Sequence, residues 1–165
     1  MSDRMSVEID GHGAGIHFSA AHFLVDVDKC ERVHGHNYIL SAIVEGRPDE
    51  SGMVIDFTEV KRILREIAES MDHHVLVPGD GVLVVEIEGD EVSMEHDGHR
   101  YVLPTRDVVI LDVPAITAEN LAVSVLERFR SMLDNDNIVS LSIGIEEGPG
   151  QTAWVHSGIG GPDDR

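Results

Sequence analysis

Two histidines separated by one glycine form the segment with the clearest potential for chemistry. In His34-Gly35-His36 the imidazoles stand at i and i+2, so they share one face of an extended segment. His22 ends an earlier predicted strand, and three imidazoles converge if the two strands are neighbours. Three neutral imidazoles with an open fourth position describe a catalytic zinc site better than a closed structural one. Zn²⁺ held in this way polarises a carbonyl or hydroxyl oxygen as a Lewis acid.

Chance and one other protein class also produce this pattern. The chain has ten histidines, so a single His-x-His carries little weight alone. A cupin opens its metal site with His-x-His on a strand, but it places a Glu a few residues on. Here the next acidic residue is Glu45, nine positions after His36, and two strong predicted helices fit a jelly roll poorly.

The lone cysteine, Cys30, lies four residues before His34 and has no partner for an internal disulfide. A small core hydrophobe is the commonest fate of a free cysteine. However, its four nearest neighbours are charged, which indicates a solvent-facing loop: Asp28, Lys29, Glu31 and Arg32. A thiol beside a metal and two cations is suited to act as a base.

Asp72-His73-His74 follows directly after a predicted helix. An Asp beside a His can fix its tautomer and stabilise the imidazolium, as proton relays require. The alternative is a helix C-terminus carrying histidines, which the helix dipole also favours.

The apolar periodicity predicts an α+β fold. Two amphipathic helices are expected at 57–71 and 118–133, the second capped by Thr117. The predicted strands are Ile16–His22, Asn37–Glu45, Val54–Phe57, Ile138–Glu147 and Thr152–His156. A β-rich insert at about 78–112 adds Val82–Ile87, Glu91–His96, Arg100–Leu103 and Val108–Leu111. We expect an antiparallel sheet with both helices on one face, a single domain over 1–156 and a flexible tail at 157–165.

The composition limits the partners. A formal charge of −19 over 165 residues argues against a nucleic-acid or anionic-membrane surface. We interpret the charge as a solubilising surface. No apolar run has the length of a signal peptide or a membrane helix, so we expect a cytoplasmic protein.

Five motifs occur in one order. They are Phe18-Ser19-Ala20-Ala21-His22, Cys30-x-x-x-His34-Gly35-His36-Asn37-Tyr38, Gly52-Met53-Val54-Ile55-Asp56-Phe57, Met71-Asp72-His73-His74-x-Leu76 and Thr117-Ala118-Glu119-Asn120. Over roughly 16–76 and 114–155 the chain resembles the family of 6-pyruvoyl-tetrahydropterin and 6-carboxy-tetrahydropterin synthases.

The resemblance implies a tunnelling fold (T-fold), whose subunits close a barrel as trimers that stack into a hexamer. It implies Zn²⁺ on His22, His34 and His36. It also implies that Cys30 is the catalytic base and that Asp72 with His73 forms the second proton-transfer pair, often completed across a subunit interface. The family substrate is 7,8-dihydroneopterin triphosphate.

A glutamate near the domain's end anchors the pterin ring in that family. The alternation of Leu141, Ile143 and Ile145 places Glu147 on their face and Glu146 on the other, so we choose Glu147, with Glu146 as the fallback. The resemblance adds Thr117 to the substrate-binding residues. Lys29 and Arg32 are candidates for the triphosphate.

The spacing of Cys30 and His34 matches the carboxy-tetrahydropterin branch, so the predicted activity is that of a 6-carboxy-5,6,7,8-tetrahydropterin synthase on the path to 7-deazaguanine (queuosine and archaeosine) nucleosides. This enzyme is a lyase. Departures from the family pattern are Val77, Gly148 and the insert. The alternatives are a pyruvoyl synthase, an archaeal-type enzyme that forms 6-hydroxymethyl-dihydropterin, for which Glu31 would supply the base, and a non-catalytic zinc or pterin binder.

Overall fold

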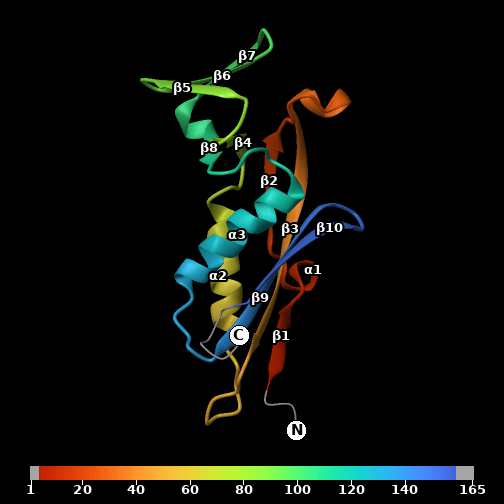
Figure 1. Cartoon of the computed structure of the whole chain (residues 1–165), viewed down its shortest axis with the longest axis vertical. Coiled ribbons are helices and arrows are strands. Elements are labelled where there is room, and N and C mark those ends of the chain that lie inside the picture. Colours follow the sequence, from red (N-terminus) through yellow and green to blue (C-terminus); the bar gives the residue numbers. More distant parts are fainter. Residues whose placement is uncertain (1–3, 159–165) are drawn as a thin grey trace.

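One mixed sheet forms the body of the molecule, and two helices cover one of its faces (Figure 1). The computed structural model describes residues 4–158. Its strand order is β10-β9-β3-β2-β4-β8, with β1 also paired to β3. The strands are β1 (Met5–Ile9), β2 (His17–His22), β3 (His34–Gly46), β4 (His74–Pro78), β8 (Val108–Leu111), β9 (Ile138–Gly148) and β10 (Gln151–Gly158). The α+β T-fold prediction is therefore confirmed, while two pairings, β2 with β4 and β4 with β8, are parallel rather than antiparallel.

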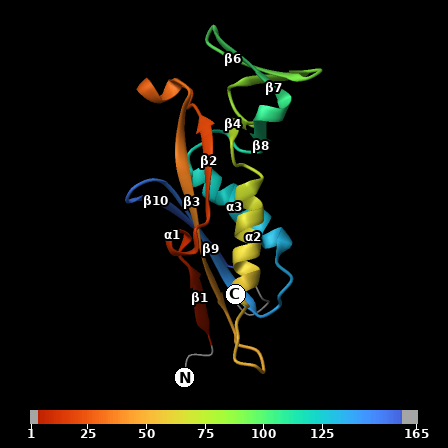
Figure 2. The same cartoon turned by 180° about the vertical axis from the view of Figure 1, so that it is seen from behind.

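The covering helices are α2 (Phe57–Glu69) and α3 (Ala118–Met132), as the periodicity predicts. They lie side by side on the same face in both views (Figures 1 and 2). Their apolar stripes are buried: Val60, Ile63, Leu64 and Ile67 from α2, and Leu121, Ala122, Val125 and Phe129 from α3. These side chains pack on the inward row of the sheet and form the main core. No helix in residues 4–158 has the length and apolar character needed to cross a membrane.

The predicted strand Val54–Phe57 is wrong. Val54 and Ile55 are buried in the core, but they lie in a bend and have no strand partner. Asp56 accepts a hydrogen bond from the Thr58 N–H at 2.7 Å and caps α2, so the helix begins at Phe57. Burial of an apolar pair before a helix cap produced the same pattern as a short strand.

The insert is smaller than predicted. Strands β5 (Val84–Glu88), β6 (Glu91–His96) and β7 (His99–Pro104) form a separate antiparallel sheet at one end of the molecule (Figure 1). Val108–Leu111, predicted as part of the insert, is β8 of the main sheet. A second apolar cluster joins the small sheet to the main one through Phe23, Val77, Leu83, Val92 and Met94. Phe23 directly follows His22, so the insert packs beside the candidate site.

Three short strands or helices escaped the sequence prediction: β1, β4 and the one-turn helix α1 (Gly11–Ala14). Asp10 caps α1 through two backbone N–H groups. At the other end, β10 continues to Gly158, so the first two residues of the predicted tail are paired with β9. The rest of that tail lies outside the described residues.

Candidate active site

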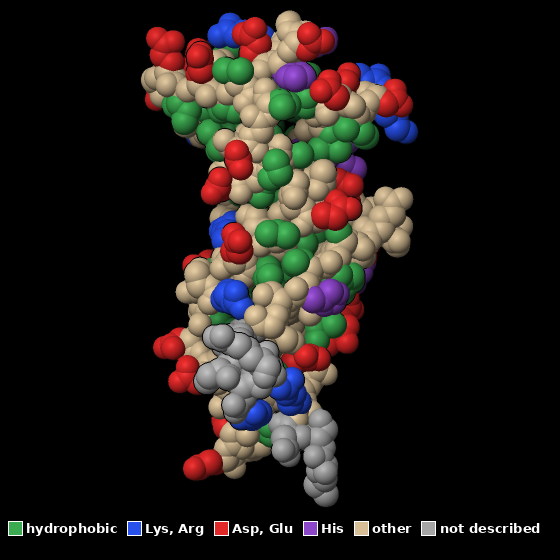
Figure 3. Space-filling view, viewed as in Figure 1, with side chains coloured by type: hydrophobic (Ala, Val, Ile, Leu, Met, Phe, Trp, Pro, Cys, Tyr) green, Lys and Arg blue, Asp and Glu red, His purple; other side chains and the backbone are tan. Residues whose placement is uncertain are grey.

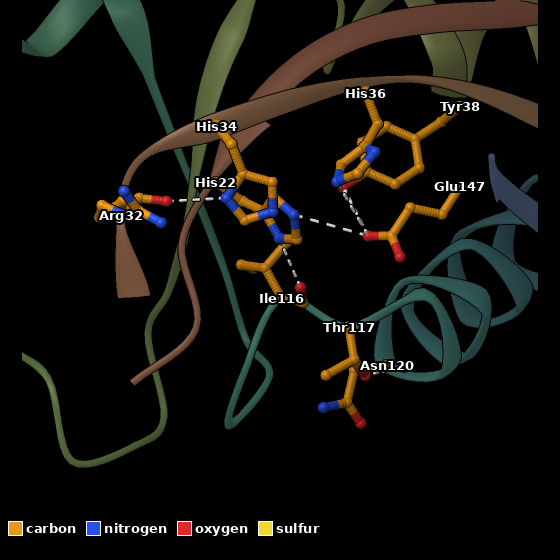
Figure 4. Close-up of polar contacts among 9 residues, drawn as sticks. All are labelled: His22, Arg32, His34, His36, Tyr38, Ile116, Thr117, Asn120 and Glu147. Atoms are coloured by element: carbon orange, nitrogen blue, oxygen red, sulfur yellow. Dashed lines mark hydrogen bonds and ion pairs between the residues drawn. The ribbon is translucent and has the colours of Figure 1, made fainter. Parts of the chain in front are cut away.

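The three histidines lie on the face of the sheet that carries the core side chains, at the end where the sheet extends beyond the covering helices. In β3, Tyr38 and Leu40 are fully buried, and His34 and His36 continue their alternation toward the strand's start. His22 is the direct partner of His34 across β2 and β3, so the two strands are neighbours as the prediction required. Because opposite residues of an antiparallel pair share a face, the three imidazoles converge (Figure 4).

The histidine geometry fits a metal ion. One ligand atom from each of His22, His34 and His36 lies within 4.8 Å of the others, and no comparable group lies elsewhere in residues 4–158. His22 Nδ1 donates to the Ile116 carbonyl and His34 Nδ1 donates to the Arg32 carbonyl, each at 2.7 Å. Backbone carbonyls only accept, so both rings carry their proton on Nδ1 and present a bare Nε2, as outer-shell partners of metal-binding histidines do.

The His22 ring is prepared as a neutral ligand. It is 1% exposed, and its Nε2 is buried without a hydrogen-bond partner among the described residues. Burial lowers the pKa of His22, and the nearby His34 and His36 act in the same direction. The Ile116 carbonyl and Glu147 oppose that shift of the pKa but do not reverse it. A buried nitrogen lone pair without a partner costs folding free energy, and a bound metal ion would remove that cost.

Glu147 lies beside this centre. Its Oε1 is 3.5 Å from His22 Nε2 and 3.6 Å from His36 Nε2 (Figure 4). Tyr38 donates its hydroxyl to the same oxygen at 3.4 Å, and burial raises the pKa of this tyrosine far above its usual range. Glu146 points to the opposite face, where its carboxylate meets His12 at 3.0 Å. The two glutamates are thus separated by the strand alternation, with Glu147 on the histidine side.

Three open hollows lie around the histidines, and most of the other residues predicted for the site line them. Glu147 and Thr117 line one of about 370 Å³, together with Gln151 and Thr152. Lys29, Cys30, Arg32 and His34 line a second of about 390 Å³. His36 and His73 line a third of about 530 Å³, with Asn37 and Asp107. Every residue predicted for the site except Asp72 therefore borders one of these hollows or belongs to the histidine centre.

Cys30 lies in a short 3₁₀ turn, Asp28–Glu31, that leads into β3. The turn is held at both ends of Cys30, since its N–H donates to the Val27 carbonyl and its carbonyl accepts from the Leu24 N–H. The side chain is half-buried, while Lys29, Glu31 and Arg32 are exposed. This placement matches the predicted solvent-facing loop.

Asp72 and His73 form a hydrogen-bonded pair. His73 Nδ1 donates to Asp72 Oδ2 at 2.7 Å, and Asp72 Oδ1 accepts the Ser19 N–H at 2.7 Å. The Ser19 hydrogen bond, and then His73, lower the pKa of Asp72. His73 has φ of +59°, a conformation that non-glycine residues adopt at a cost, and its side chain is 83% exposed. The backbone of His73 also donates to the Ser19 carbonyl, so β2 fixes both members of the pair.

Sequence reasoning missed Tyr38 and the carbonyl of Ile116. Tyr38 ends the His34–Tyr38 motif and, at a spacing of two residues, shares a strand face with His34 and His36. This spacing could have predicted its place in the site. The role of the Ile116 carbonyl could not be predicted, because every residue has a backbone carbonyl whatever its type. Thr117 caps α3 by accepting the Asn120 N–H, as predicted.

Comparison with known proteins identifies the family. A family model described as 6-pyruvoyl tetrahydropterin synthase matches residues 14–157. The chain belongs to this family. It is therefore a tetrahydropterin synthase of the lyase type, and the resemblance drawn from the five motifs is confirmed.

The alignments with two archaeal relatives cover most of each relative and most of this chain. The putative 6-carboxy-5,6,7,8-tetrahydropterin synthase of Methanocaldococcus jannaschii is 32% identical over 154 residues, 90% of this chain and 94% of the relative. The protein of that name from Pyrococcus horikoshii is 36% identical over 140 residues, 84% of each chain. Among solved structures, 6-pyruvoyl tetrahydropterin synthase from Plasmodium falciparum has a TM-score of 0.88 and 27% identity, covering 96% of this chain and 100% of the other.

Proposed function

We propose that this tetrahydropterin synthase is a zinc-dependent 6-carboxy-5,6,7,8-tetrahydropterin synthase that acts on 7,8-dihydroneopterin triphosphate. The observation that carries the proposal is the convergence of His22, His34 and His36 with both proton-transfer candidates on neighbouring segments. The names of the archaeal relatives support the carboxy branch.

His22, His34 and His36 would hold the metal through their Nε2 atoms. When bound, Zn²⁺ supplies Lewis-acid polarisation of the substrate's side-chain oxygens, which makes the adjacent C–H and O–H bonds more acidic. The protein fixes the rings through the carbonyls of Ile116 and Arg32 and keeps His22 out of water.

Glu147 and Thr117 would bind the pterin in their shared hollow. A carboxylate accepts two hydrogen bonds from the amino and ring N–H groups of a pterin in a bidentate match. Tyr38 orients Glu147 by donating its hydroxyl from a fully buried position. With the ring anchored there, the substrate side chain extends toward the histidines, because Glu147 lies between its hollow and them.

Cys30 would remove a proton from the substrate side chain, and the Asp72–His73 pair would transfer the second proton. His73 Nδ1 is fixed by Asp72, which leaves its Nε2 to exchange a proton with the substrate. Lys29 and Arg32, which line the Cys30 hollow, would pair with the triphosphate. The products would be 6-carboxy-tetrahydropterin, acetaldehyde and triphosphate.

Two specific observations favour a second activity, that of a 6-pyruvoyl or side-chain-cleaving synthase. The solved structures with the high TM-scores are 6-pyruvoyl tetrahydropterin synthases of Plasmodium, and for the P. vivax enzyme a glutamate is described as the catalytic residue. Glu31 adjoins Cys30 here and is exposed on the same turn. A non-catalytic zinc or pterin binder would need neither Cys30 nor the Asp72–His73 pair.

We further propose that the chain works as a hexamer of two stacked trimers in the cytoplasm, on the path to 7-deazaguanine nucleosides. The exposure of the ordered His73 ring supports assembly, because a neighbouring subunit can then complete the proton-transfer site.

The deciding experiment is turnover of 7,8-dihydroneopterin triphosphate by zinc-loaded protein, with products identified by mass spectrometry. Acetaldehyde with a carboxy-pterin supports the first proposal. A pyruvoyl or hydroxymethyl product supports the second, and zinc and pterin binding without turnover supports the binder.

A further inference from the structure

The Glu147 carboxylate faces two imidazole nitrogens, one of which, His22 Nε2, is buried without a hydrogen-bond partner among the described residues. Oε1 lies 3.5 Å from His22 Nε2 and 3.6 Å from His36 Nε2, which is too long for good hydrogen bonds. His22 donates through Nδ1 to Ile116, so its Nε2 offers a lone pair toward the carboxylate. Two acceptors that face each other in a partly buried site repel unless a cation lies between them.

The separations agree with those between ligands of one metal ion. Ligand atoms bound at 2.0–2.2 Å in tetrahedral geometry are about 3.3–3.6 Å apart. Glu147 Oε1 therefore lies at the distance of a fourth ligand from two of the three histidines. Glu147 reaches this position from β9, a different strand from those that carry the histidines.

The carboxylate is also held in place. Tyr38 donates to Oε1 at 3.4 Å, and its ring is fully buried and stacked on Phe18 with centroids 4.9 Å apart. The Glu147 side chain is 28% exposed, so it has room to leave this position toward the adjoining hollow.

We propose that Glu147 caps the metal as its fourth ligand in the substrate-free enzyme and leaves it when a pterin takes the carboxylate. This inference rests on the proposed function, which supplies the metal and the pterin. The cap keeps water and small anions off the metal until the substrate arrives. Glu147 then exposes the metal only when a pterin occupies the hollow that Glu147 lines.

The test uses the full-length protein loaded with Co²⁺, with azide as a probe of the open position, followed through the visible absorption of the cobalt. We expect Glu147→Gln to bind azide at least tenfold more tightly than wild type and to bind Co²⁺ at least tenfold more weakly. Glu146→Gln is the matched control, since that carboxylate lies on the other face beside His12, and it should change neither constant.

The exchange is tested by adding pterin without a side chain, which fills the ring site and offers the metal no ligand. In wild type, pterin should raise azide affinity at least tenfold, and azide should raise pterin affinity by the same factor, because such coupling is reciprocal. In Glu147→Gln this coupling should vanish. Glu147→Asp, whose carboxylate is one methylene shorter, should behave like Glu147→Gln in azide binding and covers the case in which the glutamine variant fails to fold.

Three outcomes would overturn the cap. Unchanged azide and Co²⁺ affinities in both Glu147 variants would show that the carboxylate is not a ligand, while turnover by wild type would leave the proposed function standing. Pterin that leaves azide binding unchanged or weakens it would refute the exchange. Equal Co²⁺ binding by wild type and His34→Ala would refute the metal centre itself, and the proposed function with it.

Discussion

His22 and His34 face each other in register across β2 and β3, and each donates Nδ1–H to a backbone carbonyl. The sheet thus sets the ring positions, and two loops set the ring orientations. Neither ring needs to move to direct its Nε2 toward the shared centre.

His34→Ala should therefore remove one metal ligand without disturbing the fold. We expect zinc affinity to fall by more than about 100-fold, beyond the loss caused by removing an outer-shell partner. Competition with a chelator measures it. His17→Ala, an exposed histidine on β2, is the control. Full zinc occupancy in His34→Ala would contradict the ligand assignment.

Cys30→Ala should keep zinc and lose turnover by about 10²–10⁴-fold, the usual contribution of a general base. The 3₁₀ turn is held by backbone hydrogen bonds, so the substitution leaves the loop in place. Glu31→Gln is the matched variant. Loss of metal in Cys30→Ala would make Cys30 a ligand, and loss of turnover in Glu31→Gln alone would transfer the role of base to Glu31.

Asp72→Asn should reduce turnover by about 10²-fold or more, because it deprives His73 of its anionic partner. It should also alter the acid stability. The pKa of Asp72 is lowered in the fold, so the unfolded chain binds its proton first as the pH falls. The stability that Asp72 contributes is complete above roughly pH 4 and is lost below it.

Urea denaturation between pH 3 and pH 7, followed by circular dichroism, measures the free energy of unfolding and thus the contribution of Asp72 to it. Wild type should lose stability more steeply than Asp72→Asn at the acid end. Asp107→Asn, in the hollow that His73 lines, is the control for turnover. Parallel stability curves for wild type and Asp72→Asn would contradict the linkage.

Met94→Ala should loosen the insert and not the main core. Met94 is 1% exposed within the second apolar cluster, and truncating such a side chain costs about 2–5 kcal/mol. We expect faster amide hydrogen exchange in β5 to β7 and in the segment after Phe23, with α2 and α3 unchanged. Val102→Ala, an exposed residue of β7, should have no such effect. Equal acceleration throughout the chain would mean that the insert and core unfold together.

The sequence predicted the elements where side-chain periodicity sets the structure. The apolar stripe of α3 and the alternation in β9 each left a pattern, and the alternation predicted that Glu147 and Glu146 lie on opposite faces. In the structure those faces carry the three histidines and His12, respectively. Strand β4 was not predicted, and strand direction leaves no pattern because parallel and antiparallel neighbours alternate alike, so its parallel pairings were missed as well.

The site was predictable only in part. Spacing alone joins His34 to His36, but His22 joins them through a register that no local pattern specifies. The five motifs in series supplied that link. The carbonyl that orients His22 belongs to Ile116, whose side chain is simply part of the core, so only the folded structure reveals its role.

Asp and Glu side chains spread over the face drawn in Figure 3, and the chain carries a formal charge of −19. The proposed triphosphate substrate would therefore be repelled at long range and attracted close to Lys29 and Arg32, the two cations proposed to bind it. Salt screens the repulsion, since the Debye length falls from about 30 Å at 0.01 M to about 8 Å at 0.15 M. We expect kcat/KM to rise several-fold over this range, measured by initial rates, and a fall would mean that the two cations dominate at a distance. The negative charge thus makes capture of the proposed substrate depend on the ionic strength around the protein.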